Sequence, residues 1–260
     1  MKIVVIGGTG LIGSKVVAKL GEHGHEAVAA SPASGVNTLT GEGLEEVLKG
    51  ADVVVDVSNS PSFEEGAATE FFRVANTNLL AAEAAAGVGH HVALSVVGTD
   101  RLAANHDDPK STAGYFRAKA LQERLIQQSG LPYSIVHATQ FFEFAASIAD
   151  VSTDGDKVRL PTALIQPMAA EDVAKAVGRT AVGTPTNTVT EIGGPEQYGL
   201  DEFIRIALTA RQDPRTVVAD DSATYYGIPI EERSLVPAGD AVLGDIHLDD
   251  WLAAQATEGK

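Results

Sequence analysis

A chain of 260 residues is long enough for one large α/β domain, alone or with a small appendage. It contains no Cys, which excludes disulfides, thiolate nucleophiles and Cys-ligated metals. The formal net charge is −16 and the basic residues are scattered, so nucleic acids and anionic membrane surfaces are not expected as partners. No apolar run approaches the roughly 20 residues that a membrane span needs. Together with the absence of Cys, this favours a cytoplasmic location.

The first twenty residues predict a phosphate-binding turn. The apolar, β-branched run Lys2–Ile6 is typical of a buried strand, a glycine-rich turn follows it, and residues 14–20 have helical spacing. Glycines let the main chain approach a ligand closely, and the unpaired N–H groups that open a helix attract an anion. We therefore expect a pyrophosphate to bind here. The residues expected to contact it are Gly7, Thr9, Gly10, Leu11, Ile12 and Gly13. The alternative is an ordinary tight turn.

Strands and helices then alternate as far as about residue 141. The expected strands cover residues 25–30, 52–57, 90–98 and 133–137, and the expected helices cover 11–20, 43–48, 71–86 and 115–128. Such alternation is typical of a doubly wound parallel sheet, so we predict an α/β protein of Rossmann type. Beyond residue 150 the alternation loosens, which indicates a small C-terminal α/β subdomain. We predict a dinucleotide-binding domain over residues 1–150, and a substrate-binding subdomain over 151–260 that is interleaved with it.

The residues after the second strand are those that distinguish NAD from NADP in dinucleotide folds. An acidic residue there binds the ribose of NAD, and a basic residue accepts the 2′-phosphate of NADP, but this chain has neither. Ser31, Ser34, Asn37 and Thr38 can donate hydrogen bonds to a phosphate and nothing repels one, so we favour NADP(H), with NAD(H) as the alternative. These four can also be plain turn residues. After the third strand, Val57, Ser58 and Asn59 are expected to contact the adenosine and ribose.

Tyr115 and Lys119 are four residues apart on the predicted helix 115–128, and therefore share a face. A Tyr phenol, with an ordinary pKa of about 10, exchanges protons poorly at neutral pH, and a nearby ammonium lowers that pKa. Tyr115 can then give a proton to a carbonyl oxygen as hydride arrives, or take it back from an alcohol. Lys119 can also hold the nicotinamide ribose. Ser95, near the end of the strand 90–98, can orient the same carbonyl.

These features together resemble the extended or atypical short-chain dehydrogenases/reductases. The resemblance rests on the glycine turn at residues 7–13, on Ser95 in its strand, and on the Tyr115-x-x-x-Lys119 pair. Residues 135–144, which read Ile-Val-His-Ala-Thr-Gln-Phe-Phe-Glu-Phe, are similar to the NmrA-like, NAD(P)H-binding branch. The resemblance implies a Rossmann domain with a small C-terminal substrate subdomain, an NAD(P) cofactor at the glycine turn, and a triad of Ser95, Tyr115 and Lys119.

Three histidines and one loop also attract attention. His137 stands where this branch is expected to have Arg, and a strand His is more often structural than catalytic. His90 and His91 begin a strand without a third ligand at a familiar spacing, so no metal site is predicted. The polar loop 99–112 runs from the end of a strand to the next helix, and we expect it to act as a lid.

Two classes of function follow. The first is NADPH-dependent, reversible reduction of a ketone or aldehyde to an alcohol, with Tyr115 as general acid/base helped by Lys119 and Ser95. The second is an NmrA-like protein that senses NAD(P) and regulates a partner without turnover. Sensors commonly lack the Tyr that this chain keeps, so we favour the enzyme. A quinone or azo reductase, which needs less help from Tyr115, is a third alternative.

The substrate pocket is expected between the carboxyl edge of the sheet and the C-terminal subdomain. No convergent Arg pair is visible, so an apolar or aromatic carbonyl compound fits better than a charged acid. The residues expected to line this pocket are Val97, Phe141, Phe142, Met168 and Tyr226. The alternative is that these aromatic side chains belong to the core. We expect a monomer or a homodimer.

Overall fold

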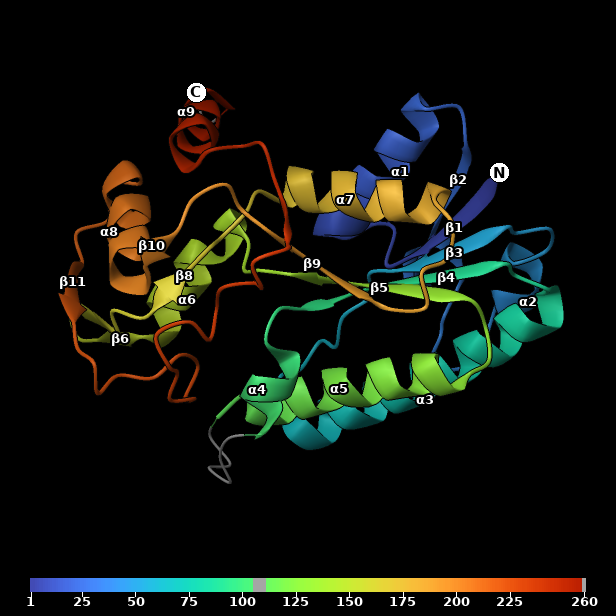
Figure 1. Ribbon diagram of the computed structural model, residues 1–260, viewed down its shortest axis with the longest axis horizontal. Coiled ribbons are helices and arrows are strands. Elements are labelled where there is room, and N and C mark those ends of the chain that lie inside the picture. Colours follow the sequence, from blue (N-terminus) through green and yellow to red (C-terminus); the bar gives the residue numbers. More distant parts are fainter. Residues whose placement is uncertain (105–110, 259–260) are drawn as a thin grey trace.

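The computed structural model describes residues 1–104 and 111–258, and its centre is a seven-stranded parallel sheet (Figure 1). The strand order is β12-β9-β5-β4-β3-β1-β2. These strands are β1 (Lys2–Ile6), β2 (Glu26–Ala30), β3 (Val53–Asp56), β4 (His90–Val96), β5 (Tyr133–Ala138), β9 (Val189–Gly193) and β12 (Val242–Leu243). The order reverses between β1 and β3, where ligands bind in doubly wound sheets. The predicted Rossmann-type fold is confirmed.

Helices cover both faces of the sheet, as a parallel sheet requires (Figure 1). One face carries α1 (Leu11–Glu22) and α7 (Ala170–Val182); the other carries α2 (Leu44–Val47), α3 (Glu65–Ala86) and α5 (Ala113–Gln128). The alternation of side chains along β1 divides the core accordingly, because successive residues point to opposite faces. Val5 packs with Val16 of α1, whereas Val4 packs with Leu79 of α3.

The loop that was expected to be a lid is helical in its first half. Residues 99–104 form the short helix α4 (Thr99–Ala104), which packs on α5. Residues 105–110 lie outside the described part of the chain. Within that described part, no helix has the length and apolarity needed to cross a membrane.

The second part of the molecule lies beside the main sheet (Figure 1). It contains a three-stranded sheet in the order β11-β7-β6, a two-stranded sheet and three helices. Its elements are α6 (Ala145–Val151), β6 (Thr153–Asp154), β7 (Lys157–Leu160), β8 (Leu164–Ile165), β10 (Tyr198–Gly199), α8 (Leu200–Ala210), β11 (Thr216–Ala219) and α9 (Leu248–Glu258). One apolar cluster joins Phe72 of α3 and Phe116 of α5 to Leu160 and Phe203 of this part. Residues beyond 150 also supply strands β9 and β12 to the main sheet, and helix α7 to one of its faces.

Candidate active site

Glycines shape the turn between β1 and α1. Gly7 has a φ of +77°, a left-handed conformation that favours glycine, and its N–H donates to the carbonyl oxygen of Ala30 at 2.9 Å. The N–H of Gly10 donates to the carbonyl oxygen of Gly7, also at 2.9 Å. A Cβ atom on Gly13 would lie 2.1 Å from that same Gly7 oxygen. The start of α1 can therefore pack against the turn only because Gly13 has no side chain.

The N-terminus of α1 has the features of an anion site. Gly10 caps the helix in an extended conformation without a side-chain hydrogen bond, and the first turn contains no acidic residue. The first N–H groups of a helix lack intrahelical partners, and the helix dipole is positive at this end. Gly10, Leu11 and Ile12 line a cleft with a volume of about 630 Å³. These residues fit the pyrophosphate of a dinucleotide without any basic side chain.

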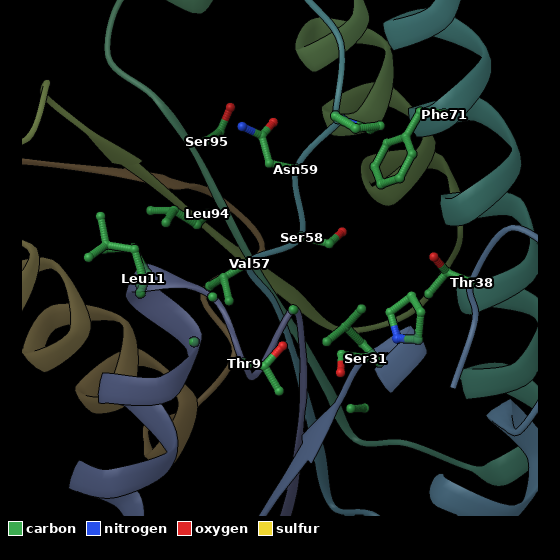
Figure 2. A pocket seen from close by; sticks show the side chains of 18 of the residues that line it. Thr9, Leu11, Ser31, Thr38, Val57, Ser58, Asn59, Phe71, Leu94 and Ser95 are labelled. Carbon is green, nitrogen blue, oxygen red and sulfur yellow. The ribbon is translucent and has the colours of Figure 1, made fainter. Parts of the chain in front are cut away.

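This main cleft extends along the carboxyl edge of the sheet (Figure 2). Ser31 and Thr38 lie toward one end of it, Asn59 and Ser95 toward the other, and Val57 lies between them. Most of the residues predicted to bind cofactor or to act in catalysis line it. They are Gly7, Thr9, Gly10, Leu11, Ile12, Gly13, Ser31, Asn37, Thr38, Val57, Ser58, Asn59, Ser95, Tyr115 and Lys119, together with the predicted substrate residue Phe141.

Ser34 is the predicted cofactor residue that does not line the cleft. Its hydroxyl accepts a hydrogen bond from the N–H of Ser31 at 2.9 Å and donates to the carbonyl oxygen of Ser31 at 3.0 Å. Ser34 therefore stabilises the short turn after β2 rather than facing a ligand. Asn37 does line the cleft, and its Oδ1 accepts a hydrogen bond from the N–H of Leu39 at 2.9 Å. Among the lining residues between 31 and 39 there is no charged side chain.

A buried carboxylate shapes the turn after β3. Asp56 is 2% exposed, and it accepts hydrogen bonds from the N–H of Ser58 at 2.9 Å and from the Ser58 hydroxyl at 2.6 Å. Its second oxygen accepts from Nε2 of Gln122 in α5 at 3.0 Å. The turn is thus held from the strand below and from the helix beside it. This fixes the direction in which the next residue, Asn59, enters the cleft.

Tyr115 lies at the boundary between the cleft and the core. Its hydroxyl donates to Oδ1 of Asn59 at 3.0 Å, and its ring makes an edge contact with Phe63 at a centroid distance of 5.0 Å. Burial raises the pKa of Tyr115 to about 12, because the phenolate loses its hydration. The expectation that a neighbouring ammonium lowers this pKa is therefore wrong. At neutral pH the phenol keeps its proton.

Lys119 shares a face of α5 with Tyr115, but its ammonium group is directed elsewhere. Its Nζ donates to the carbonyl oxygen of Leu94 at 2.9 Å and to Oε1 of Gln122, and it lies 4.8 Å from the centroid of the Phe72 ring. The residue is 3% exposed, and burial lowers the pKa of Lys119 to about 8. Through Gln122 the ammonium is connected to the carboxylate of Asp56. Lys119 thus anchors α5 to the sheet edge.

The hydroxyl of Ser95 is already engaged by a buried side chain. It donates to Oε1 of Glu123, and Nε2 of His137 lies 3.0 Å from the same oxygen. Burial acts to raise the pKa of Glu123, but the hydrogen bonds and charge of His137, the bond from Ser95 and the charge of Lys119 outweigh it, so the pKa lies below its ordinary value. Glu123 is therefore a carboxylate at neutral pH, and Ser95 must be the donor. Sequence reasoning missed Glu123, although its spacing of four residues from Lys119 places it on the same face of α5.

Four of the five predicted substrate residues lie outside the main cleft. Val97, Phe142 and Met168 are 0%, 1% and 1% exposed, and all three are buried in the core. Phe142 packs against the ring of Trp251 at 5.5 Å. Tyr226 lines a separate hollow with Thr112, and its hydroxyl is 3.2 Å from Oγ of Ser147. These four side chains therefore contact the core or another surface of the protein, and not the main cleft.

Apart from Phe141, the apolar wall of the cleft consists of residues that the sequence did not single out. Phe141 stacks on Phe144 at a centroid distance of 5.1 Å, and Leu94 and Val96 of β4 lie in the same wall. The unpredicted lining residues are Ile6, Ala30, Pro32, Val36, Leu39, Pro61, Phe71, Leu94, Val96 and Phe144. Ile6, Ala30, Leu94 and Val96 are adjacent to predicted site residues at the carboxyl ends of strands, which is the signal that could have found them. Phe71, by contrast, lies within helix α3.

The paired histidines have structural contacts. Nδ1 of His91 is 2.9 Å from a carboxylate oxygen of Glu83, and both residues are 0% exposed. Nε2 of His90 is 2.9 Å from Oγ of Ser134 on the neighbouring strand. In residues 1–104 and 111–258 there is no group of three or more metal-binding side chains that could hold an ion.

Comparisons with known proteins identify the family of the chain and the relatives of its fold. Residues 7–181 match a family model described as NAD(P)H-binding. No curated protein matches the sequence. Among solved structures, UDP-glucose 4-epimerase from Thermotoga maritima with UDP-glucose has a TM-score of 0.71 at 16% identity, with 100% of each chain covered. MoeE5 with UDP-glucuronic acid and NAD has a TM-score of 0.69 at 17% identity, again with 100% of each chain covered.

A third structure was solved with the other dinucleotide. It is dTDP-4-dehydrorhamnose reductase from Bacillus anthracis in complex with NADP. The TM-score is 0.66 at 12% identity, and 95% of this chain and 91% of that chain are covered. At such identities these likenesses establish the shared fold alone.

Proposed function

Because this chain belongs to the family of NAD(P)H-binding proteins, we propose that it is an NADPH-dependent oxidoreductase that reduces a ketone or aldehyde to an alcohol. The observation that carries the proposal is the presence of Tyr115, a buried proton donor, in the same cleft as the glycine turn. When bound, the reduced dinucleotide supplies the hydride that the carbonyl carbon accepts. The side chains of the cleft then have to deliver one proton to the carbonyl oxygen.

Tyr115 is suited to give that proton. With its pKa raised to about 12, the phenol stays protonated across the neutral range. The alkoxide that hydride addition leaves on the substrate is a stronger base than a phenolate, so transfer of the proton from Tyr115 to that oxygen is downhill. The phenolate afterwards takes a proton from water. The same raised pKa disfavours alcohol oxidation near pH 7, because that direction requires the phenolate as base.

Lys119 and Ser95 have narrower parts in this proposal. The Lys119 ammonium is bonded to Leu94 and Gln122, so in the resting site it holds α5 against β4 rather than tuning Tyr115. With its pKa lowered to about 8, it is a cation at neutral pH and can turn to a ribose hydroxyl of the cofactor. Ser95 lines the cleft beside the reacting groups, with its proton held by Glu123.

The neutral end of the cleft supports NADP(H) as the cofactor. Ser31 and Asn37 provide uncharged hydrogen-bonding groups, and no carboxylate among the lining residues after β2 would repel a 2′-phosphate. An NAD-specific site in this fold typically has an acidic residue on the ribose hydroxyls, and this segment contains none. We therefore assign the preference to NADPH.

The apolar wall supports an apolar or aromatic carbonyl compound as the substrate. Phe141, Phe144, Leu94 and Val96 give it hydrophobic contacts, and Lys119 is the one basic side chain among the lining residues. Recognition of a carboxylate or phosphate usually relies on Arg, which this wall lacks. A ketone with an aryl or alkyl substituent fits these surroundings.

Turnover measurements test the proposal. NADPH oxidation is followed optically with aryl ketones, aldehydes and quinones, for the wild type and for Tyr115→Phe. We expect Tyr115→Phe to lower kcat for ketones by about 10²- to 10⁴-fold, the usual contribution of a general acid. If the wild type binds NADPH but turns over no substrate, the protein is a sensor of the dinucleotide. Turnover of quinones alone, undiminished in Tyr115→Phe, identifies a quinone reductase instead.

A further inference from the structure

The resting site leaves one requirement of the proposed reaction unmet. A carbonyl that accepts hydride develops negative charge on its oxygen, and a second hydrogen-bond donor beside the proton donor stabilises that charge. Sequence reasoning assigns this part to Ser95. The Ser95 proton, however, is donated to Glu123, whose carboxylate also faces His137 at 3.0 Å. Ser95 therefore presents lone pairs to the cleft and acts there as an acceptor.

Asn59, which contacts the Tyr115 hydroxyl directly, has a hydrogen-bond donor to spare. Its Oδ1 accepts the hydroxyl proton of Tyr115 at 3.0 Å and the N–H of Ser60 at 2.9 Å. These two donors fix which end of the carboxamide is oxygen. The amide nitrogen is then left without a protein partner among the described residues. Figure 2 shows this nitrogen on the side of Asn59 that faces Ser95, within the cleft.

We infer that Asn59 is a catalytic residue, whose amide nitrogen donates a hydrogen bond to the substrate carbonyl oxygen and whose amide oxygen holds the hydroxyl of Tyr115 until the substrate arrives. The two atoms belong to one carboxamide, so an oxygen that approaches the Tyr115 hydroxyl also comes within reach of Nδ2. The Asp56–Ser58 bonds hold the turn that carries Asn59, which preorganises the donor. The inference rests on the proposed function, because it concerns the same reduction.

Electrons and protons balance in this arrangement. The Tyr115 hydroxyl turns its proton from Oδ1 of Asn59 to the carbonyl oxygen of the substrate. The carbonyl carbon then gains the hydride, the oxygen gains the proton of Tyr115, and Asn59 keeps both of its amide protons. Nδ2 stabilises the oxygen only while its charge is developing, so its loss lowers kcat rather than raising KM. A residue that merely held the cofactor would change the affinity for NADPH instead.

Two substitutions separate the two ends of the carboxamide. Asn59→Asp keeps an acceptor for Tyr115 and Ser60 but removes the donor, and Asn59→Ala removes both. We expect each to lower kcat for ketone reduction at saturating NADPH by about 10²- to 10³-fold, the effect of losing one such donor. Ser95→Ala is expected to lower kcat by less than either. NADPH affinity is measured by fluorescence titration and folding by thermal unfolding for every variant.

A matched control is available at the opposite edge of the sheet, where strand β5 begins. Asn187 accepts the N–H of Tyr133 through its own Oδ1 at 3.1 Å and lies outside the main cleft. Asn187→Asp makes the same chemical change without touching the site, and kcat should stay at the wild-type value. If Asn59→Asp retains the wild-type kcat in an enzyme that reduces ketones, the inference is wrong and the proposed function stands. If the wild type reduces no carbonyl compound, both are overturned.

Discussion

The two ends of the main cleft are built from different parts of the chain. At the nucleotide end, main-chain groups form the site: the glycine turn and the first N–H groups of α1 all come from residues 7–13. At the chemical end, side chains from separate segments meet, and the contact between Tyr115 and Asn59 joins positions 56 residues apart. A site formed by a short stretch of main chain tolerates few residue types at its own positions, because side chains there would displace the backbone. A site assembled from distant side chains depends on each hydrogen bond in a network.

The largest effect should come from Gly13→Ala at the nucleotide end. The added Cβ would lie 2.1 Å from the carbonyl oxygen of Gly7, and neither partner is a flexible side chain. The helix start must shift, which moves the N–H groups away from the proposed position of the pyrophosphate and strains the turn. We expect loss of NADPH binding by fluorescence titration and a lower melting temperature.

Gly21→Ala in the same helix is the matched control. Nothing lies within 4 Å of a Cβ built at Gly21, so the change only replaces a poor helix former by a good one. This variant should bind NADPH normally and gain about 0.5–1 kcal/mol of stability. Equal binding by Gly13→Ala and Gly21→Ala would show that the backbone end is more tolerant than we conclude.

The buried ammonium of Lys119 should make stability depend on pH at the chemical end. Its folded pKa of about 8 lies below its ordinary value of 10.5, so between these pH values the unfolded chain binds more protons than the folded chain. The free energy of unfolding therefore rises with pH across this window. Relative to Lys119→Met, the wild type should gain up to about 3 kcal/mol from pH 8 to pH 10.5.

Urea unfolding of the two proteins at several pH values measures this gain. Lys157→Met, which alters an exposed lysine of β7, should leave the pH profile of the wild type unchanged. A constant difference between the wild type and Lys119→Met throughout the window contradicts the buried, desolvated position of this ammonium.

A smaller effect is expected at Asn37, where we propose that the 2′ group of the cofactor binds. Asn37→Asp keeps the acceptor for the Leu39 N–H but places a carboxylate in the cleft. Repulsion of a 2′-phosphate by about 1.4 kcal/mol corresponds to a tenfold weaker affinity for NADPH, while NADH should be affected less. Titration with both dinucleotides, with Asn187→Asp as the control, measures the ratio. An unchanged ratio would mean that the 2′ group binds elsewhere.

The contrast between the two ends also explains what the sequence could predict. The glycine turn and the parallel fold were predictable because strand, turn and helix start are consecutive in the chain, and each limits its residue types locally. The shared helix face of Tyr115 and Lys119 was predictable for the same reason. The direction of the Lys119 ammonium was not, because it depends on the carbonyl of Leu94 and the amide of Gln122, which only the folded chain brings together.

Burial accounts for the remaining differences. The sequence does not show that Tyr115 is desolvated, so its pKa was expected to fall rather than rise. Phe141 and Phe142 are adjacent, yet the first lines the cleft and the second packs against Trp251. The path of the short connection after β5 decides which of these two side chains faces the cleft. The amino-acid composition carries no information about that path.

The position of β9 in the sheet affects how the protein folds while it is being synthesised. β5 pairs on one side with β4 and on the other with β9, whose residues follow β5 by about fifty positions. A ribosome that has released only residues 1–150 presents a sheet with an open edge at β5 and an α1 that lacks its neighbour α7. Open edges of this kind pair with other chains. Residues 1–150 therefore cannot complete the main sheet alone. Their folding waits for α7 and β9, which leave the ribosome after β6, β7 and β8 of the second part.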